Sequence, residues 1–219
     1  MFCTHTRYNM VWDGLLSIKV TELHGALKRK SRKSKDREKK KCYGTSISDR
    51  PEIAAQRMEE GHWEGGTVVG KRAGHEAVVL TLLEKKTENY LAIRIPGKTS
   101  KAVMDAMATL RAGYVQHFPQ VFKTITADNG SEFAGFAQTE AWGSKVFFAH
   151  PYTSWERVQN KRHNGLFRPF VPKGVSIELF TDEDILVAAD ELNGRPRRKL
   201  GYCTPEELFE TFLDTVYAA

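Results

Sequence analysis

The spacing of strand and helix patterns between residues 61 and 219 is the feature that most constrains how this chain can fold. Three strand patterns follow one another closely, at residues 63–69, 76–85 and 90–95. The breaks between them are short and contain Gly70, Gly74 or charged residues, so the simplest connection is an antiparallel meander. We therefore expect a sheet that begins with three antiparallel strands.

From residue 99 onward, helix and strand patterns alternate. The expected elements are a helix over residues 99–114, a strand ending at Asp128, a strand over residues 145–150, a helix over residues 153–167 and two helices capped by Thr181 and Thr204. Helices between the later strands imply crossover connections, and these join parallel strands. The order predicts an α/β fold in which helices flank a mixed five-stranded sheet, which is the plan of ribonuclease-H-like domains.

The strand that ends at Asp128 is the strongest candidate for a functional position. Residues 122–127 favour an extended and partly buried strand, and Asn129-Gly130 permits a turn directly after the aspartate. The ends of strands in such sheets present side chains to ligands, because the strand fixes the backbone and the loop leaves the side chain exposed. An aspartate that only organises its own turn is an equal alternative from this segment alone.

The positive charge of the chain is concentrated in one segment, residues 28–41. The chain carries a net charge of +6, and this segment alone carries ten cations and two anions, so the remaining residues have a net charge of −2. The cations are Lys28, Arg29, Lys30, Arg32, Lys33, Lys35, Arg37, Lys39, Lys40 and Lys41. Such a segment repels itself, and we interpret it as a basic N-terminal arm that contacts nucleic-acid phosphates, with a solvated linker as the alternative.

Length and residue usage bound the remaining properties. A chain of 219 residues can form one core of ordinary size. We expect an N-terminal segment with the arm at residues 1–60, a core at residues 61–172 and helices that complete it at residues 173–219. Three cysteines without metal-ligand spacing, no long apolar run and no signal-peptide pattern at the start predict a cytoplasmic protein without membrane spans.

Several motifs, in their order and spacing, resemble the transposases of the insertion-sequence-thirty family. They are His62-Trp-Glu-Gly65, Thr126-Ala-Asp-Asn-Gly-Ser-Glu-Phe133, Phe148-Ala-His-Pro-Tyr-Thr-Ser-Trp-Glu-Arg157, Asn164-Gly-Leu166, Leu192-Asn-Gly-Arg-Pro196 and Thr204-Pro-Glu206. The resemblance implies a retroviral-integrase-like core of the DDE type, which acts on DNA. It also implies Mg²⁺ or Mn²⁺, because in such sites two metal ions about 4 Å apart, held by acids, activate the attacking oxygen and stabilise the leaving oxygen.

This chain departs from the family pattern at two of the three acidic positions. Asp128 matches the second acid, so it is the predicted catalytic and metal-binding residue. Gly66 stands where the first acid is expected, and Lys161 stands where the third is expected. We expect metal binding to be weakened or lost, because an ammonium group near the site repels cations.

Four neighbouring acids are candidate substitutes for the missing ligands. Glu64 lies on the same strand face as Gly66 but about 7 Å away, which is too far for a bridging ligand. Glu156 is the acid of a capping box. Glu132 and Asp105 are interpreted as solvated or capping acids, with support of the metal site as the alternative. We do not expect any of them to restore the metal site.

These motifs leave two hypotheses. The first is an active transposase with an unusual metal site, and the second is a non-catalytic relic that binds DNA or oligomerises. The helix-turn-helix region that usually precedes residue 8 in this family is absent, which suggests an N-terminally truncated copy with reduced site-specific recognition.

A second cationic cluster, Arg195, Arg197, Arg198 and Lys199, is a further DNA-binding candidate. Because it follows a helix C-terminus, complementing the helix dipole is an equal alternative. For Trp63, Trp142 and Trp155, core packing is favoured over a role in the cleft.

Overall fold

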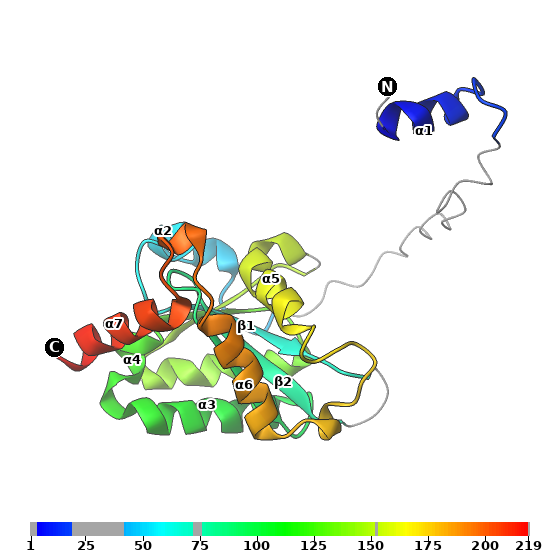
Figure 1. Ribbon diagram of the computed structural model, residues 1–219. Coiled ribbons are helices and arrows are strands. Elements are labelled where there is room, and N and C mark those ends of the chain that lie inside the picture. The colour runs from blue at the N-terminus through cyan, green and yellow to red at the C-terminus, as the bar shows by residue number, and fades with distance from the viewer. Residues whose placement is uncertain (1–3, 19–41, 72–75, 152, 219) are drawn as a thin grey trace. The chain divides into compact units, whose positions relative to one another are not determined.

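The computed structural model describes residues 4–18, 42–71, 76–151 and 153–218 (Figure 1). The chain divides into two compact units, residues 1–38 and 39–219. In the first unit, α1 covers Thr4–Trp12. The basic arm at residues 28–41 and Cys3 lie outside the described residues, so the proposed role of the arm stays a prediction.

The second unit contains the sheet and the helices around it. Its strands are β1 (His62–Val68), β2 (Val78–Glu84), β3 (Tyr90–Ile95), β4 (Thr124–Ala127) and β5 (Lys145–Phe148). Its α-helices are α2 (Glu52–Gln56), α3 (Ser100–Tyr114), α4 (Phe118–Val121), α5 (Val158–Phe167), α6 (Asp182–Asn193) and α7 (Pro205–Tyr217). Short 3₁₀ turns join them, including η2 (Ile47–Asp49), η4 (Ser131–Phe133) and η6 (Ser154–Arg157).

The five strands form one mixed sheet in the order β3-β2-β1-β4-β5. The first three strands pair antiparallel, whereas β1 pairs parallel with β4 and β4 pairs parallel with β5. This is the predicted α/β architecture, and the expected meander and crossovers are both confirmed. The strand bounds differ from expectation by one or two residues at β1, β2, β4 and β5.

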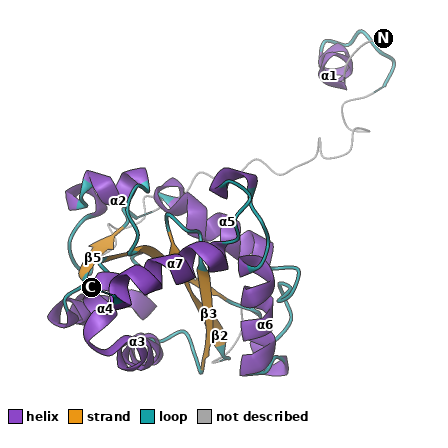
Figure 2. Ribbon diagram, turned by 60° about the vertical axis from the view of Figure 1, so that its left-hand side comes forward, coloured by secondary structure: helices purple, strands orange, loops and turns teal. Residues whose placement is uncertain are grey.

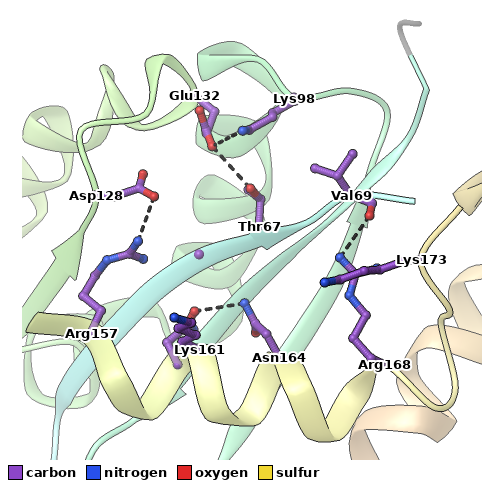
Figure 3. A pocket seen from close by; sticks show the side chains of 12 residues that line it. Thr67, Val69, Lys98, Asp128, Glu132, Arg157, Lys161, Asn164, Arg168 and Lys173 are labelled. Atoms are coloured by element: carbon purple, nitrogen blue, oxygen red, sulfur yellow. Dashed lines mark hydrogen bonds and ion pairs between the residues drawn. The ribbon is translucent and has the colours of Figure 1, made fainter. Parts of the chain in front are cut away.

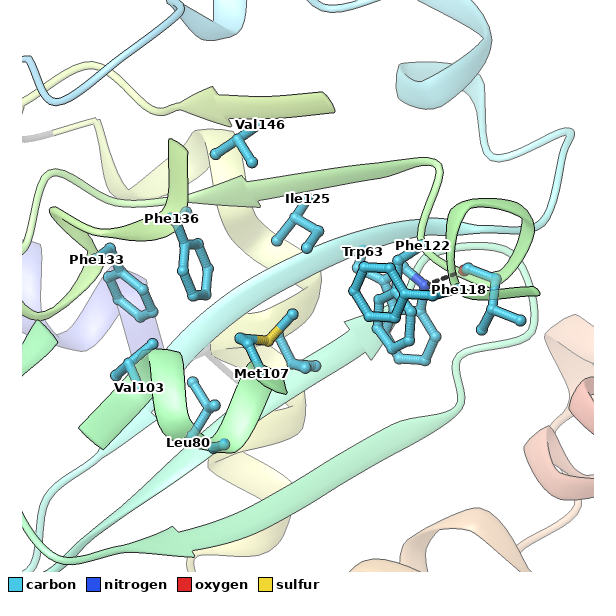
Figure 4. Packing of buried hydrophobic residues seen from close by; sticks show 14 of the residues in the cluster. Trp63, Leu80, Val103, Met107, Phe118, Phe122, Ile125, Phe133, Phe136 and Val146 are labelled. Atoms are coloured by element: carbon cyan, nitrogen blue, oxygen red, sulfur yellow. Dashed lines mark hydrogen bonds between the residues drawn. The ribbon is translucent and has the colours of Figure 1, made fainter. Parts of the chain in front are cut away.

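Alternating side chains of the strands divide the core between the two faces of the sheet. One face packs against α3, α4 and α7, where Trp63 stacks on Phe122 and its indole N–H donates to the Val121 carbonyl at 2.7 Å (Figure 4). The other face packs against α5 and α6, with Phe167 and Leu192 among its buried side chains. Figure 2 shows α3 and α6 on opposite sides of β2 and β3.

Residues that precede the sheet also pack onto it. Ser46 forms a parallel bridge with Phe148 at the end of β5, and Ala54 of α2 is fully buried. A methyl group on Gly44 would lie 2.7 Å from the Phe148 ring, so this approach requires a glycine. These contacts lie within the unit formed by residues 39–219. The domain boundaries expected at residues 60 and 172 stay predictions.

Two local expectations are corrected. The spacing of Thr153 and Glu156 predicted a capping box that starts a helix, but η6 intervenes and α5 begins only at Val158. The reason is that the Glu156 carboxylate instead accepts hydrogen bonds from the backbone N–H and Nδ1 of His150, both at 2.7 Å. Trp63 and Trp142 pack in or against the core as expected, whereas Trp155 is 69% exposed.

Candidate functional site

A pocket of about 430 Å³ lies where β1, β4 and α5 meet (Figure 3). It is lined by Gly66, Thr67, Val69, Lys98, Asp128, Glu132, Arg157, Asn160, Lys161, Asn164, Arg168 and Lys173. The structure thus brings together Gly66, Asp128 and Lys161, the three positions singled out in the sequence.

The parallel pairing of β1 and β4 explains why two of these positions meet. Trp63 pairs with Ile125 and Glu64 pairs with Thr126. Continuing this register by two residues places Gly66 beside Asp128, just past the C-terminal end of β4. Lys161 reaches the same place from α5, which packs across β1 and β2.

The Asp128 carboxylate is engaged by a cation. Its Oδ2 accepts a hydrogen bond from Nη2 of Arg157 at 2.7 Å, and its Oδ1 accepts one from the N–H of Gly130 at 2.9 Å. Nη1 of Arg157 donates to the Gly65 carbonyl at 2.6 Å, which fixes the guanidinium between the two strands. The aspartate therefore organises its own turn, as the alternative interpretation held, and also lines the pocket.

Gly66 leaves no space for a side chain, because Asn160 occupies it. A Cβ atom on Gly66 would lie 2.3 Å from Oδ1 of Asn160 and 3.3 Å from Oγ1 of Thr81. Asn160 is 2% exposed, and its Nδ2 donates to the Glu64 carbonyl at 3.0 Å and to Thr81 Oγ1 at 3.3 Å. Its Oδ1 accepts from Nδ2 of Asn164 at 3.1 Å.

Of the four acids weighed as substitutes, only Glu132 lines the pocket. It is 3% exposed, forms an ion pair with Lys98 at 3.0 Å and accepts a hydrogen bond from Thr67 at 3.3 Å. Glu64 is buried outside the pocket and accepts from the N–H of Asn160 at 3.0 Å. Asp105 is paired with Lys101 at 2.6 Å on the exposed side of α3, and Glu156 binds His150.

The arrangement does not fit a pair of divalent metal ions. Both carboxylates of the pocket are already paired with cations, and within the described part of the chain no group of three or more His, Cys, Asp or Glu residues could hold a metal. Mg²⁺ requires hard anionic oxygen ligands, and cations beside the site oppose its binding.

Sequence reasoning missed most of the basic residues of the pocket. Lys98, Arg157, Arg168 and Lys173 line it but were not assigned to it beforehand. A signal was available on the helix, since residues 157, 161, 164 and 168 recur at helical spacing and so share one face. Lys98 and Lys173 gave no such signal, because only the tertiary structure brings their loops to the pocket.

The second cationic cluster is partly engaged within the fold. Arg197 donates to Glu88 at 2.8 Å, Lys199 forms a second ion pair with the same carboxylate, and the Glu88 side chain is only 3% exposed. Arg195 lies 3.6 Å from Glu191 and over the ring of Phe170.

Glu88 thus gives Arg197 and Lys199 a structural role that was not foreseen. Arg198 is exposed, and within the described residues no ion pair to it is found. It is therefore the member of the cluster best placed for an external anion.

The fold is that of a retroviral-integrase-like catalytic core. The catalytic core domain of BIV integrase superposes with a TM-score of 0.53 at 17% identity, covering 71% of this chain and 97% of that one. Among the described residues, no helix is long and apolar enough to cross a membrane. No protein-family model matches the sequence.

Sequence relatives are transposases. The chain is 36% identical to the probable transposase for insertion-like sequence element IS1161 of Streptococcus salivarius over 207 residues, which cover 94% of this chain and 58% of that protein. It is 31% identical to the transposase for insertion sequence element IS4351 of Bacteroides fragilis, covering 98% and 65% respectively. Transposase InsI for insertion sequence element IS30A of Escherichia coli is 33% identical over 168 residues, covering 76% and 42%.

The chain is thus a homologue of the insertion-sequence-thirty family and other insertion-sequence transposases, and the resemblance seen in its motifs is confirmed. It spans between about two fifths and two thirds of the length of these relatives.

Proposed function

We propose that this protein is a transposase of a DNA insertion element that associates with DNA but has lost metal-dependent strand cleavage and strand transfer. The relationship to transposases supports the first part. The second part depends on one observation. The three positions at which the family would supply acids line one pocket, and they hold a glycine, an aspartate bound to Arg157 and a lysine.

Loss of cleavage follows from the charges around Asp128. A metal ion would have to displace Arg157 from the carboxylate and then bind beside Lys161 with no acid at position 66. Glu132 could contribute a second carboxylate only by leaving Lys98. In each case a carboxylate would give up a favourable ion pair in order to bind a metal ion that the neighbouring basic side chains repel.

The competing hypothesis is an active transposase with a different metal site, and one assay separates the two. Purified full-length protein would be incubated with DNA carrying element ends, in Mg²⁺ or Mn²⁺, and strand cleavage and transfer would be followed. We expect DNA binding in a mobility-shift assay and no product. Metal-dependent product that disappears in Asp128→Ala would overturn the proposed loss of activity, and absence of any DNA binding would overturn the proposed association.

The candidate DNA-contacting cations differ in whether they already have an acidic partner within the fold. We propose Arg198 and the cations of residues 28–41 as the phosphate contacts. Arg197 and Lys199 are weaker candidates, because they already pair with Glu88. Phosphate contacts of this kind do not read sequence. Homo-oligomerisation and a cytoplasmic location stay predictions, and analytical ultracentrifugation would test the first.

A further inference from the structure

The charge of the pocket is the opposite of what a cation site needs. Its lining carries five basic side chains and two carboxylates, a net charge of +3. Two of the basic side chains, Arg157 and Lys98, are each paired with one carboxylate. Lys161, Arg168 and Lys173 therefore supply the excess positive charge.

None of these three cations has a carboxylate partner within the described part of the chain. Lys161 and Lys173 are exposed at the mouth of the pocket. The Arg168 guanidinium is held by neutral groups, since it donates to the Val69 carbonyl at 3.0 Å and to the Val171 carbonyl at 3.4 Å. Carbonyls orient the guanidinium but leave its charge uncompensated.

We propose that the pocket is a metal-independent binding site for one phosphate group, held chiefly by Lys161, Arg168 and Lys173. Like charges that converge on one cavity repel one another unless an anion is bound between them. The three cations come from α5 and from the segment that follows it, so they line one side of the cavity, across from Asp128 and Glu132 (Figure 3). A tetrahedral group with several charged oxygens matches this arrangement better than a planar carboxylate, which two donors can satisfy.

The fixed neighbours of the pocket favour the same ligand. Asn164 lines it with an amide whose oxygen accepts from Tyr90 and whose nitrogen donates to Asn160, which leaves the second N–H of that amide for a ligand. Arg157 and Lys98 also line the pocket while paired with Asp128 and Glu132. The substitution at position 161 therefore does more than remove a metal ligand, because it supplies one of the cations that receive the anion.

This inference deepens the proposed function, because a phosphate of DNA is one source of the ligand and free phosphate is the other. The first arm of the test titrates inorganic phosphate into the ¹⁵N-labelled full-length protein in EDTA at low ionic strength, with chemical shifts as the readout. We expect saturable shifts around Asn164 and Gly66. The double variant Lys161→Gln/Lys173→Gln should weaken phosphate binding at least about fivefold.

Arg162→Gln is the matched control. Arg162 is the exposed neighbour of Lys161 on α5, and its substitution removes one of the two positive charges that the double variant loses, but it does not line this pocket. We expect phosphate binding by this variant to change less than about twofold. Circular dichroism should show that all variants fold, since the substituted side chains are exposed.

The second arm measures a short DNA duplex in EDTA with the same variants. A fall in DNA affinity for the double variant only, together with competition by phosphate, identifies the backbone of DNA as the source. Unchanged DNA affinity with lost phosphate binding identifies free phosphate.

The inference is overturned if phosphate does not bind, if Arg162→Gln weakens it as much as the double variant, or if binding requires Mg²⁺. If phosphate does not bind but DNA does, only this inference fails, because the arm at residues 28–41 is proposed to contact DNA independently of the pocket. If phosphate binds but DNA does not, only the proposed association with DNA fails.

Discussion

The packing of Asn160 against Gly66 gives the sharpest test of how far this site has moved from a metal centre. Replacing Gly66 with alanine would put a Cβ atom 2.3 Å from Oδ1 of Asn160, whereas ordinary contacts begin at about 3.4 Å. Asn160 would have to swing away by about 1 Å. It could not do so without weakening the hydrogen bonds to the Glu64 carbonyl and Thr81.

The expected cost follows from these contacts. Each hydrogen bond contributes about 1 kcal/mol net, and overpacking a filled core costs about 1–3 kcal/mol. Replacing a strand glycine with alanine by itself stabilises the folded state by about 0.5–1 kcal/mol, because glycine loses more conformational entropy on folding. We therefore expect Gly66→Ala to lower the free energy of unfolding by about 2 kcal/mol. Urea denaturation followed by tryptophan fluorescence would measure it, with the buried Trp63 as a reporter.

Two further variants make the measurement specific. Gly97→Ala is the control, because the nearest atom to its Cβ would be Thr99 Cγ2 at 4.0 Å, so we expect little change. Combining Gly66→Ala with Asn160→Ala should show a coupling of about 1–2 kcal/mol, because the second change removes the collision. If Gly66→Ala is as stable as the original protein, Asn160 does not fill this space and the reasoning is refuted. The same collision predicts that Gly66→Asp with Lys161→Glu will not restore Mg²⁺ binding unless Asn160 moves.

Three further predictions concern the remaining charged groups. Glu88→Gln should lower the free energy of unfolding by about 2–3 kcal/mol, because breaking a buried ion pair costs about 3–5 kcal/mol and the partial exposure of Lys199 reduces this cost. The control Glu191→Gln, at an exposed ion pair, should cost under about 1 kcal/mol. Equal losses of stability in urea denaturation would contradict the burial argument. Burial lowers the pKa of His163 to about 4, and although burial raises the pKa of Glu88, the hydrogen bonds from Lys199 and Arg197 lower it to about 2. Both side chains bind protons more readily in the unfolded protein, so the free energy of unfolding should fall as the pH drops below about 6.5 for His163 and below about 4.5 for Glu88. An NMR titration that gives His163 a pKa near 6.5 in the folded protein would refute the prediction for His163. Neutralising the cations of residues 28–41 should lower the affinity for all DNA sequences to a similar extent and make that affinity less dependent on salt concentration, as measured by mobility shift. A loss of affinity for only some sequences would count against the arm as a phosphate contact.

The sheet topology was predictable because it depends on local patterns. Strand periodicity and short breaks required the antiparallel meander, and caps such as Thr181 and Thr204, both of which form capping boxes, marked the later helices. The local signal failed at Glu156, since the preference of its carboxylate for His150 depends on where the chain folds back after β5.

The composition of the pocket was only partly predictable. The motifs placed Gly66, Asp128 and Lys161 together, and parallel strand register explains why they meet. The pairing of Arg157 with Asp128 joins residues 29 apart, and that of Lys199 with Glu88 joins residues 111 apart. Partner choice over such distances depends on tertiary packing, which no local pattern encodes.

The contacts that hold α5 against the sheet explain how the fold persists while the site changes. Asn160 ties the helix to β1 through the backbone and carboxylate of Glu64, and His163 is held by Gln159 and Arg197. None of these contacts uses the side chain at position 66, 128 or 161. These folding contacts therefore do not require acids at positions 66, 128 and 161. The chemistry must therefore be inferred from the pocket residues and not from the fold.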